Sequence, residues 1–146
     1  MATEKVLSLI SEVRGGFIRF LESELAASSA NEVQPSYGPV LSALFKHDGK
    51  LKMKEIAHAA NRDKSTVTYL VNNLVKIGYV KKEPGRQDCR ETYVVLTQKA
   101  WDSKNTFTVI SKHLLQTAYN GFTEEEQLQL TALLTKMNNN FNRSNA

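Results

Sequence analysis

The stretch DKSTVTYLVNNL, residues 63–74, decides the fold of this chain. Its apolar residues recur at three- and four-residue steps, the spacing of one buried face on a helix. Asp63 stands where a helix N-cap is expected, and Gly78 is a stop signal. The stretch therefore predicts a helix that begins after Asp63 and ends before Gly78. Its predicted buried residues are Val67, Leu70, Val71, Leu74 and Val75.

The other face of this helix is polar and carries no acidic residue after Asp63. Small hydroxyls, an amide and a cation near a helix N-terminus suit phosphates and the base edges of the DNA major groove. A solvated face is the alternative, although such faces usually carry pairs of Glu and Lys. We therefore predict that this helix contacts DNA. The candidate contacts are Lys64, Ser65, Thr66, Thr68, Tyr69 and Asn72, with Asn73 at the edge of the face.

The flanking segments complete a helix-turn-helix and a wing. Residues 53–60 carry apolar residues on one side and predict a short helix, which a tight turn joins to the helix that begins after Asp63. A strand stub is expected at 50–52. Residues 79–83 and 92–96 are rich in strand formers, and the Pro-Gly segment 84–88 between them predicts a hairpin. The basic side chains of this wing are Lys81, Lys82, Arg86 and Arg90.

Five stretches in this block resemble the signature of MarR-type regulators, in order and at the expected spacing. They are Ile56-Ala57, residues 63–74, Gly78-Tyr79-Val80, Asp88-Cys89-Arg90 and Val95-Leu96-Thr97-Gln98-Lys99. A lone helix-turn-helix pattern is weak, whereas this combination is specific. The resemblance implies a winged helix-turn-helix transcription regulator that binds pseudo-palindromic duplex DNA as a homodimer, with repression by promoter occlusion as the default.

The resemblance also implies roles for individual residues. Arg90 would enter the minor groove while Asp88 orients its guanidinium; an exposed ion pair with no role in binding is the alternative. Cys89 replaces a residue that is often basic in the family, which implies a weaker contact with phosphate. Tyr69 stands where many relatives carry arginine, so the base preference is open. A small aromatic anionic ligand is implied in a crevice between the dimer helices and the winged region. The candidate lining residues are Arg14, Phe17, Phe20 and Tyr37.

Long amphipathic segments flank the winged region. Apolar residues recur with helical spacing over 6–25 and over 98–120, where Thr97 is the expected N-cap. Thr123 and Glu126 form a capping box ahead of a last helix. The resemblance implies that these helices interlock in a dimer, and a monomer that buries its own helices is the alternative.

We predict a mainly α fold with a small β-hairpin wing, organised in three parts. The first is an N-terminal dimerisation helix (1–34), and the second is the winged helix-turn-helix DNA-binding region (35–97). The third comprises the C-terminal dimerisation helices (98–146), of which the polar end 138–146 is expected to fray.

The positive charge of the chain is concentrated in its middle. The net charge is +4, and residues 46–104 carry 13 Lys and Arg against 7 Asp and Glu, whereas the rest carries 6 against 8. A basic segment between acidic ones suggests a surface for a polyanion. A lysine-rich solvated surface is the alternative on charge alone.

The composition, 41% hydrophobic and 23% charged, is typical of a soluble globular protein. No apolar run approaches the roughly 20 residues that cross a bilayer, and no signal peptide is indicated, so we expect a cytoplasmic protein. The single cysteine, Cys89, cannot form an intramolecular disulfide, and an ordinary exposed thiol is expected there rather than an oxidisable one.

Other chemistry has little support in the sequence. His47, His58 and His113 are scattered, with no paired carboxylate or cysteine at metal spacing, so no metal or cofactor is expected. No glycine-rich phosphate loop or nucleophile elbow is present. We expect that the chain is not an enzyme. The rival class is a winged-helix protein-interaction module that no longer binds DNA.

Overall fold

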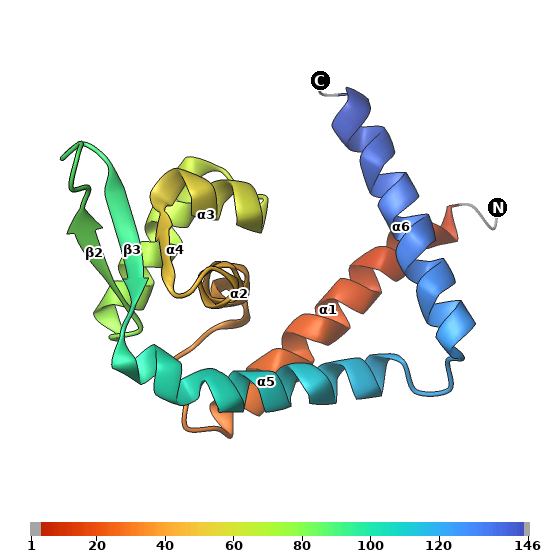
Figure 1. The fold of residues 1–146 in the computed structure, drawn as a ribbon. Helices are drawn as coiled ribbons and strands as arrows, with labels where there is room; N and C mark the ends of the chain where they lie inside the picture. Colours follow the sequence, from red (N-terminus) through yellow and green to blue (C-terminus); the bar gives the residue numbers. More distant parts are fainter. Residues whose placement is uncertain (1–3, 145–146) are drawn as a thin grey trace. The chain divides into compact units, whose positions relative to one another are not determined.

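The computed structural model describes residues 4–144, with side chains described up to Asn142. Helices dominate the fold, and a small antiparallel sheet carries the wing (Figure 1). The elements in chain order are α1 (Lys5–Ala26), the 3-10 helix η1 (Pro35–Tyr37), α2 (Gly38–Lys46), β1 (Lys50–Lys52), α3 (Met53–Ala60), α4 (Lys64–Lys76), β2 (Val80–Pro84), β3 (Thr92–Leu96), α5 (Gln98–Ala118) and α6 (Glu124–Ser144). The chain divides into two compact units, 1–111 and 112–146. The predicted mainly α fold with a hairpin wing is confirmed.

Helices α2, α3 and α4 share one hydrophobic core in the first unit. Val40 and Leu44 of α2 and Ile56 of α3 are fully buried. The predicted buried face of α4 is confirmed at Val67, Leu70, Val71 and Leu74. Val75 is 40% exposed, so its predicted burial is wrong. It follows Leu74 by a single residue, about 100° further around the helix, and so lies at the margin of the apolar stripe.

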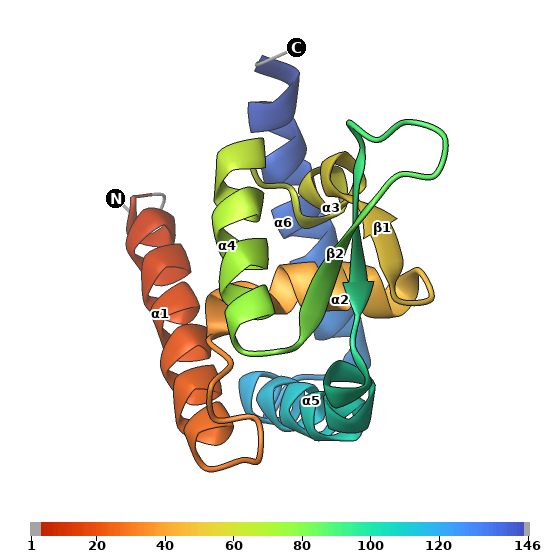
Figure 2. The same ribbon diagram turned by 90° about the vertical axis from the view of Figure 1, so that its left-hand side faces the viewer.

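The wing belongs to a three-stranded antiparallel sheet in the order β1, β3, β2. The central strand β3 pairs Val95 with Lys50 of β1, and Leu96 with Val80 of β2. Because side chains alternate along a strand, Val94 and Leu96 point into the core. Figure 2 shows the β2–β3 hairpin extending past the helices at the end of this unit where α4 begins. The start of α4 and the wing tip therefore lie at the same end of this unit.

The ends of the later helices agree only partly with the predictions. The capping box of α6 is confirmed, because Thr123 Oγ1 accepts from the Glu126 backbone N–H at 3.1 Å and Glu126 Oε1 accepts from Thr123 N–H at 3.0 Å. Thr97 directly precedes α5, but its hydroxyl donates to the Gly78 carbonyl at 2.6 Å, which ties the end of α4 to the start of α5. Fraying was expected over 138–146, yet α6 continues to Ser144; residues 145–146 lie outside the described part.

Helices α1 and α6 leave apolar faces uncovered. Among the described residues of α1, Leu25 is the buried one, and α6 contributes none to the core. Eight apolar side chains on these helices are between 38% and 66% exposed: Leu9, Ile10, Val13, Phe17, Leu130, Leu133, Leu134 and Phe141. Extended apolar surface of this kind marks an interaction site. None of the helices in the described residues combines the length and apolarity needed to cross a membrane.

Candidate nucleic-acid interface

The start of α4 is fixed by its N-cap. Asp63 Oδ1 accepts from the Thr66 backbone N–H at 2.7 Å and from the Ser65 hydroxyl at 2.9 Å. These hydrogen bonds stabilise the carboxylate form and lower the pKa of Asp63 below its ordinary value of 3.8. The cap leaves the first turn of the helix at the surface, with Lys64 and Ser65 exposed.

We expect Asp63→Ala to lower the melting temperature by a few degrees at neutral pH, because α4 loses its cap. The pKa of Asp63 is lowered on folding, so its contribution is fully present above pH 3.8 and is lost as the pH falls through the lower folded value. The difference between wild type and Asp63→Ala should therefore shrink in acid. Asp63→Asn, which retains a capping oxygen without a charge, is the control. Thermal unfolding at several pH values would contradict the cap assignment if the gap between wild type and Asp63→Ala persisted at the acid end.

The predicted contact face of α4 is partly exposed and partly used inside the helix. Lys64, Ser65, Tyr69 and Asn72 are exposed, and Tyr69 is 66% accessible. Thr66 and Thr68 are half-buried. The Thr66 N–H serves the N-cap, and the Thr68 hydroxyl donates to the Lys64 carbonyl at 2.9 Å. The hydroxyl hydrogen of Thr68 is therefore used within the helix, while its oxygen can still accept a hydrogen bond and its methyl group can contact a further surface.

The wing tip is a closed turn. Gly85 N–H donates to the Glu91 carbonyl at 2.8 Å, and Glu91 N–H donates to the Asp88 carbonyl at 3.0 Å. A Cβ at Gly85 would lie 2.5 Å from the Asp88 carbonyl oxygen, so the turn needs glycine there. Asp88 Oδ1 accepts from the backbone N–H of Arg90 at 3.0 Å and from its Nε at 3.2 Å. The Arg90 side chain is thus oriented while remaining 93% exposed.

One wing lysine is bonded to α4 and the other is not. Lys82 Nζ donates to Asn72 Oδ1, which joins β2 to α4. Lys81 lies on the opposite face of β2, where its Nζ pairs with Glu83 at 3.4 Å. The two lysines were predicted as one basic surface, and the strand separates them.

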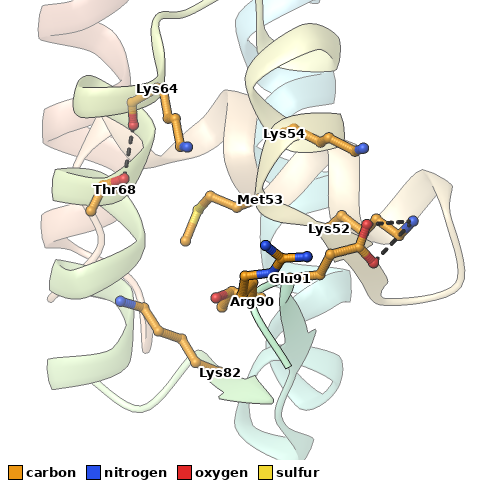
Figure 3. Close-up of a pocket in the computed structure, with 9 residues that line it drawn as sticks. Lys52, Met53, Lys54, Lys64, Thr68, Lys82, Arg90 and Glu91 are labelled. Atoms are coloured by element: carbon orange, nitrogen blue, oxygen red, sulfur yellow. Dashed lines mark hydrogen bonds and ion pairs between the residues drawn. The ribbon is translucent and has the colours of Figure 1, made fainter. Parts of the chain in front are cut away.

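A basic hollow of about 350 Å³ lies between α4, the start of α3 and the wing (Figure 3). We call it the basic groove; its lining residues are Lys52, Met53, Lys54, Lys64, Thr68, Lys82, Arg90, Glu91 and Thr92. Figure 3 shows Lys64 extending from α4 into the groove, whereas Lys82 extends from β2 toward α4, away from Arg90. Four predicted contacts, Lys64, Thr68, Lys82 and Arg90, are brought together here. Arg86 lines a second hollow of about 370 Å³ with Lys50, Lys52, Gln87, Glu91 and Tyr93.

Two cations of the basic groove were missed from the sequence. Lys52 ends β1, and Lys54 lies in the first turn of α3. The available signal was the run KLKMK, residues 50–54, in which lysines recur at every second position across a strand end. Alternation puts such lysines on one face of a strand. The wing that faces them lies far along the chain.

The residues proposed for a ligand pocket do not share one environment. Arg14 and Phe17 are exposed on α1, and Phe20 is half-buried on the same helix. Tyr37 is 6% exposed and belongs to the hydrophobic core. Cys89 is an exposed free thiol at the wing tip. Within residues 4–144, no group of three or more His, Cys, Asp or Glu side chains is placed to hold a metal ion.

Comparison with known proteins adds independent support for this architecture. Residues 39–84, which run from α2 to the end of β2, match the IclR helix-turn-helix domain. A curated relative, the uncharacterized HTH-type transcriptional regulator YkoM of Bacillus subtilis (strain 168), is 26% identical over 133 residues, covering 91% of this chain and 86% of the relative. The domain match is thus to IclR, although the sequence motifs resemble MarR-type regulators.

Solved structures share the fold at low sequence identity. The organohalide-sensing regulator RdhR-CbdbA1625, in its 2,4-dichlorophenol-bound form, superposes with a TM-score of 0.85 and 18% identity, covering 96% of this chain and 81% of that one. A mutant MarR from E. coli, complexed with operator DNA, gives a TM-score of 0.80 and 22% identity, covering 91% and 93%. The domain match, the curated relative and the shared fold together support a winged-helix transcription regulator.

Proposed function

We propose that this chain is a MarR-type transcription regulator that binds pseudo-palindromic duplex DNA as a homodimer, and that it acts by binding rather than by catalysis. In this proposal α4 enters the major groove and Arg90 enters the neighbouring minor groove. The observation that carries it is the basic groove, which Lys64, Lys82 and Arg90 line together from α4, β2 and the wing tip. A phosphodiester backbone between the two DNA grooves suits this distribution of charge.

The homodimer is supported by the uncovered apolar faces of α1 and α6. Their leucine, valine, isoleucine and phenylalanine side chains would remain in water in a monomer. A twofold dimer would bury each face against a copy of the same protein and would present two recognition helices about one helical turn of DNA apart. Such a dimer occupies a promoter, so repression by occlusion is the proposed outcome.

A small aromatic anionic ligand is the proposed effector. RdhR-CbdbA1625, which shares the fold, was solved with 2,4-dichlorophenol. In this chain Arg14, Phe17 and Phe20 lie on α1 and supply a cation and two rings, while Tyr37 would have to leave the core to take part. We therefore assign the ligand contacts to the residues of α1 and not to Tyr37.

Two substitutions separate the roles of the wing and the recognition helix. We expect Arg90→Ala to weaken binding to operator and to unrelated duplex equally, and to flatten the salt dependence by about one unit per half-site, because an electrostatic contact is lost.

Thr68→Ala should weaken binding to the operator by about 1–3 kcal/mol and leave the affinity for unrelated duplex almost unchanged, because a base contact is lost. The operator is first selected from random duplex DNA, and each variant is then titrated at several salt concentrations.

Lys112→Ala, which removes one exposed positive charge from the second unit, is the matched control for Arg90→Ala. Equal losses on both duplexes for Thr68→Ala would show that α4 does not read sequence. If the wild-type protein showed no DNA binding at any salt concentration, the rival class, a protein-interaction module, would be favoured instead.

A further inference from the structure

One ion pair forms the wall between the two basic hollows. Lys52 and Glu91 line both the basic groove and the hollow beside Arg86 and Tyr93. Lys52 Nζ lies 3.3 Å from Glu91 Oε2 and 3.4 Å from Oε1, and the two side chains are about one-third exposed. Figure 3 shows this pair on the edge of the groove. Of the nine residues that line the groove, five are cations and Glu91 is the single acid.

The identity of Lys52 is not explained by its place in the helix. It occupies the N-cap position of α3, where Ser, Thr, Asp or Asn would accept a hydrogen bond. A lysine ammonium has no acceptor. Only the reverse half of the capping pair operates, in which Glu55 Oε1 accepts from the Lys52 backbone N–H at 2.9 Å. The Lys52 side chain therefore takes no part in the cap and pairs with Glu91 instead.

Glu91 is fixed in the wing turn by its backbone. Both of its backbone groups close the wing turn, through Gly85 and Asp88. Its carboxylate raises the pKa of Lys52, first by the hydrogen bond and then by its charge. The ring of Tyr93 lies 5.9 Å from Lys52 Nζ and adds a weaker attraction. Lys52 is held mainly by Glu91 in the free protein.

We propose that Glu91 competes with a DNA phosphate for Lys52 and so limits the affinity of the wing for DNA of any sequence. The inference rests on the proposed DNA-binding function. A phosphodiester that enters the basic groove meets Lys64 and Lys82, which have no acid partner among the groove-lining residues, and Arg90, whose partner Asp88 lies outside the lining. At Lys52 it competes with Glu91, which is itself part of the lining. Removing the carboxylate gives the DNA one more available cation in each subunit.

The test compares two variants that make the same charge change on the same hairpin. Glu91→Gln should raise the affinity for unrelated duplex DNA about threefold per subunit and about tenfold for a dimer, and should steepen its salt dependence. Glu83→Gln is the matched control, because neither Glu83 nor its partners Lys50 and Lys81 line the basic groove, although Lys50 lines the second hollow. Its effect should stay within about twofold. Titrations by fluorescence anisotropy at several salt concentrations measure both.

A double variant shows whether the gain passes through Lys52. In a Lys52→Met background, Glu91→Gln should give no increase in affinity beyond that of Glu83→Gln. A gain that persists without Lys52, or equal effects of Glu91→Gln and Glu83→Gln, would overturn the competition while leaving DNA binding itself intact. If Glu91→Gln lowered both the affinity for DNA and the melting temperature, the Lys52–Glu91 pair would stabilise the fold instead, and the competition would be overturned. Wild-type protein that binds no duplex would overturn the proposed function, and this inference with it.

Discussion

Leu133→Glu is expected to sediment as a single chain at concentrations where the wild type forms the proposed dimer. Leu133 is 64% exposed in the described chain, on the same face of α6 as Leu130, Leu134 and Phe141. Burial of one leucine contributes about 2 kcal/mol, and twofold symmetry counts it twice. A loss of about 4 kcal/mol weakens association about a thousandfold. Operator affinity should fall with it, because each monomer contacts only one half-site.

Leu128→Glu is the matched control for this prediction. Leu128 is 73% exposed on the same helix, but it lies about 160° around α6 from Leu130. The same charge is introduced at a similar exposure, so a change in assembly confined to Leu133→Glu identifies the face used. Sedimentation equilibrium of both variants decides the matter. A wild-type monomer, or dimers with both variants, would remove α6 from the proposed interface.

Gly49→Ala is expected to destabilise the fold by about 2–4 kcal/mol. Gly49 has a φ of +84°, and an added Cβ would lie 2.6 Å from Trp101 Cζ2. The backbone cannot easily move away, because Gly49 N–H donates to Leu44 at 2.7 Å and its carbonyl accepts from Leu96 at 2.8 Å. The Trp101 ring itself packs edge-on against Phe45, with ring centroids 5.4 Å apart.

Gly121→Ala isolates the backbone part of this effect. Gly121 has nearly the same φ, +85°, but nothing lies within 4 Å of an added Cβ. Its cost should be about 1 kcal/mol, from the left-handed conformation alone. Urea unfolding gives both values, and the difference between them measures the clash with Trp101. Equal costs for the two substitutions would mean that the ring moves aside freely.

The elements that sequence predicted well are those set by neighbours in the chain. Residues 53–60 form a helix with the predicted bounds, and Asp63 caps α4 through an amide three residues away. The capping box of α6 is local in the same way. Periodicity also identified the buried face of α4, and it failed at Val75, where a stripe has no sharp edge.

What sequence could not predict depends on contacts between distant segments. The Thr97 hydroxyl bonds a carbonyl 19 residues earlier, although a threonine before a helix usually suggests a cap. Lys52 pairs with a glutamate 39 residues later, through the pairing of β1 with β3. Lysines in a short strand look like solvated surface until that pairing is known. The prediction that Lys81 and Lys82 form one basic surface failed for the same reason, because only the packed sheet shows which of the two faces α4.

The exposed thiol at the wing tip makes the protein well suited to spectroscopic distance measurement. Cys89 is the single cysteine of the sequence, so a maleimide dye or a spin label would attach at one position per chain. The label would lie in the turn that is closed by the backbone hydrogen bond between Gly85 and Glu91. In a dimer, two such labels would act as a ruler between the wings. The distance between the two labels, measured with and without DNA or an aromatic effector, would show how far the two wings move relative to each other.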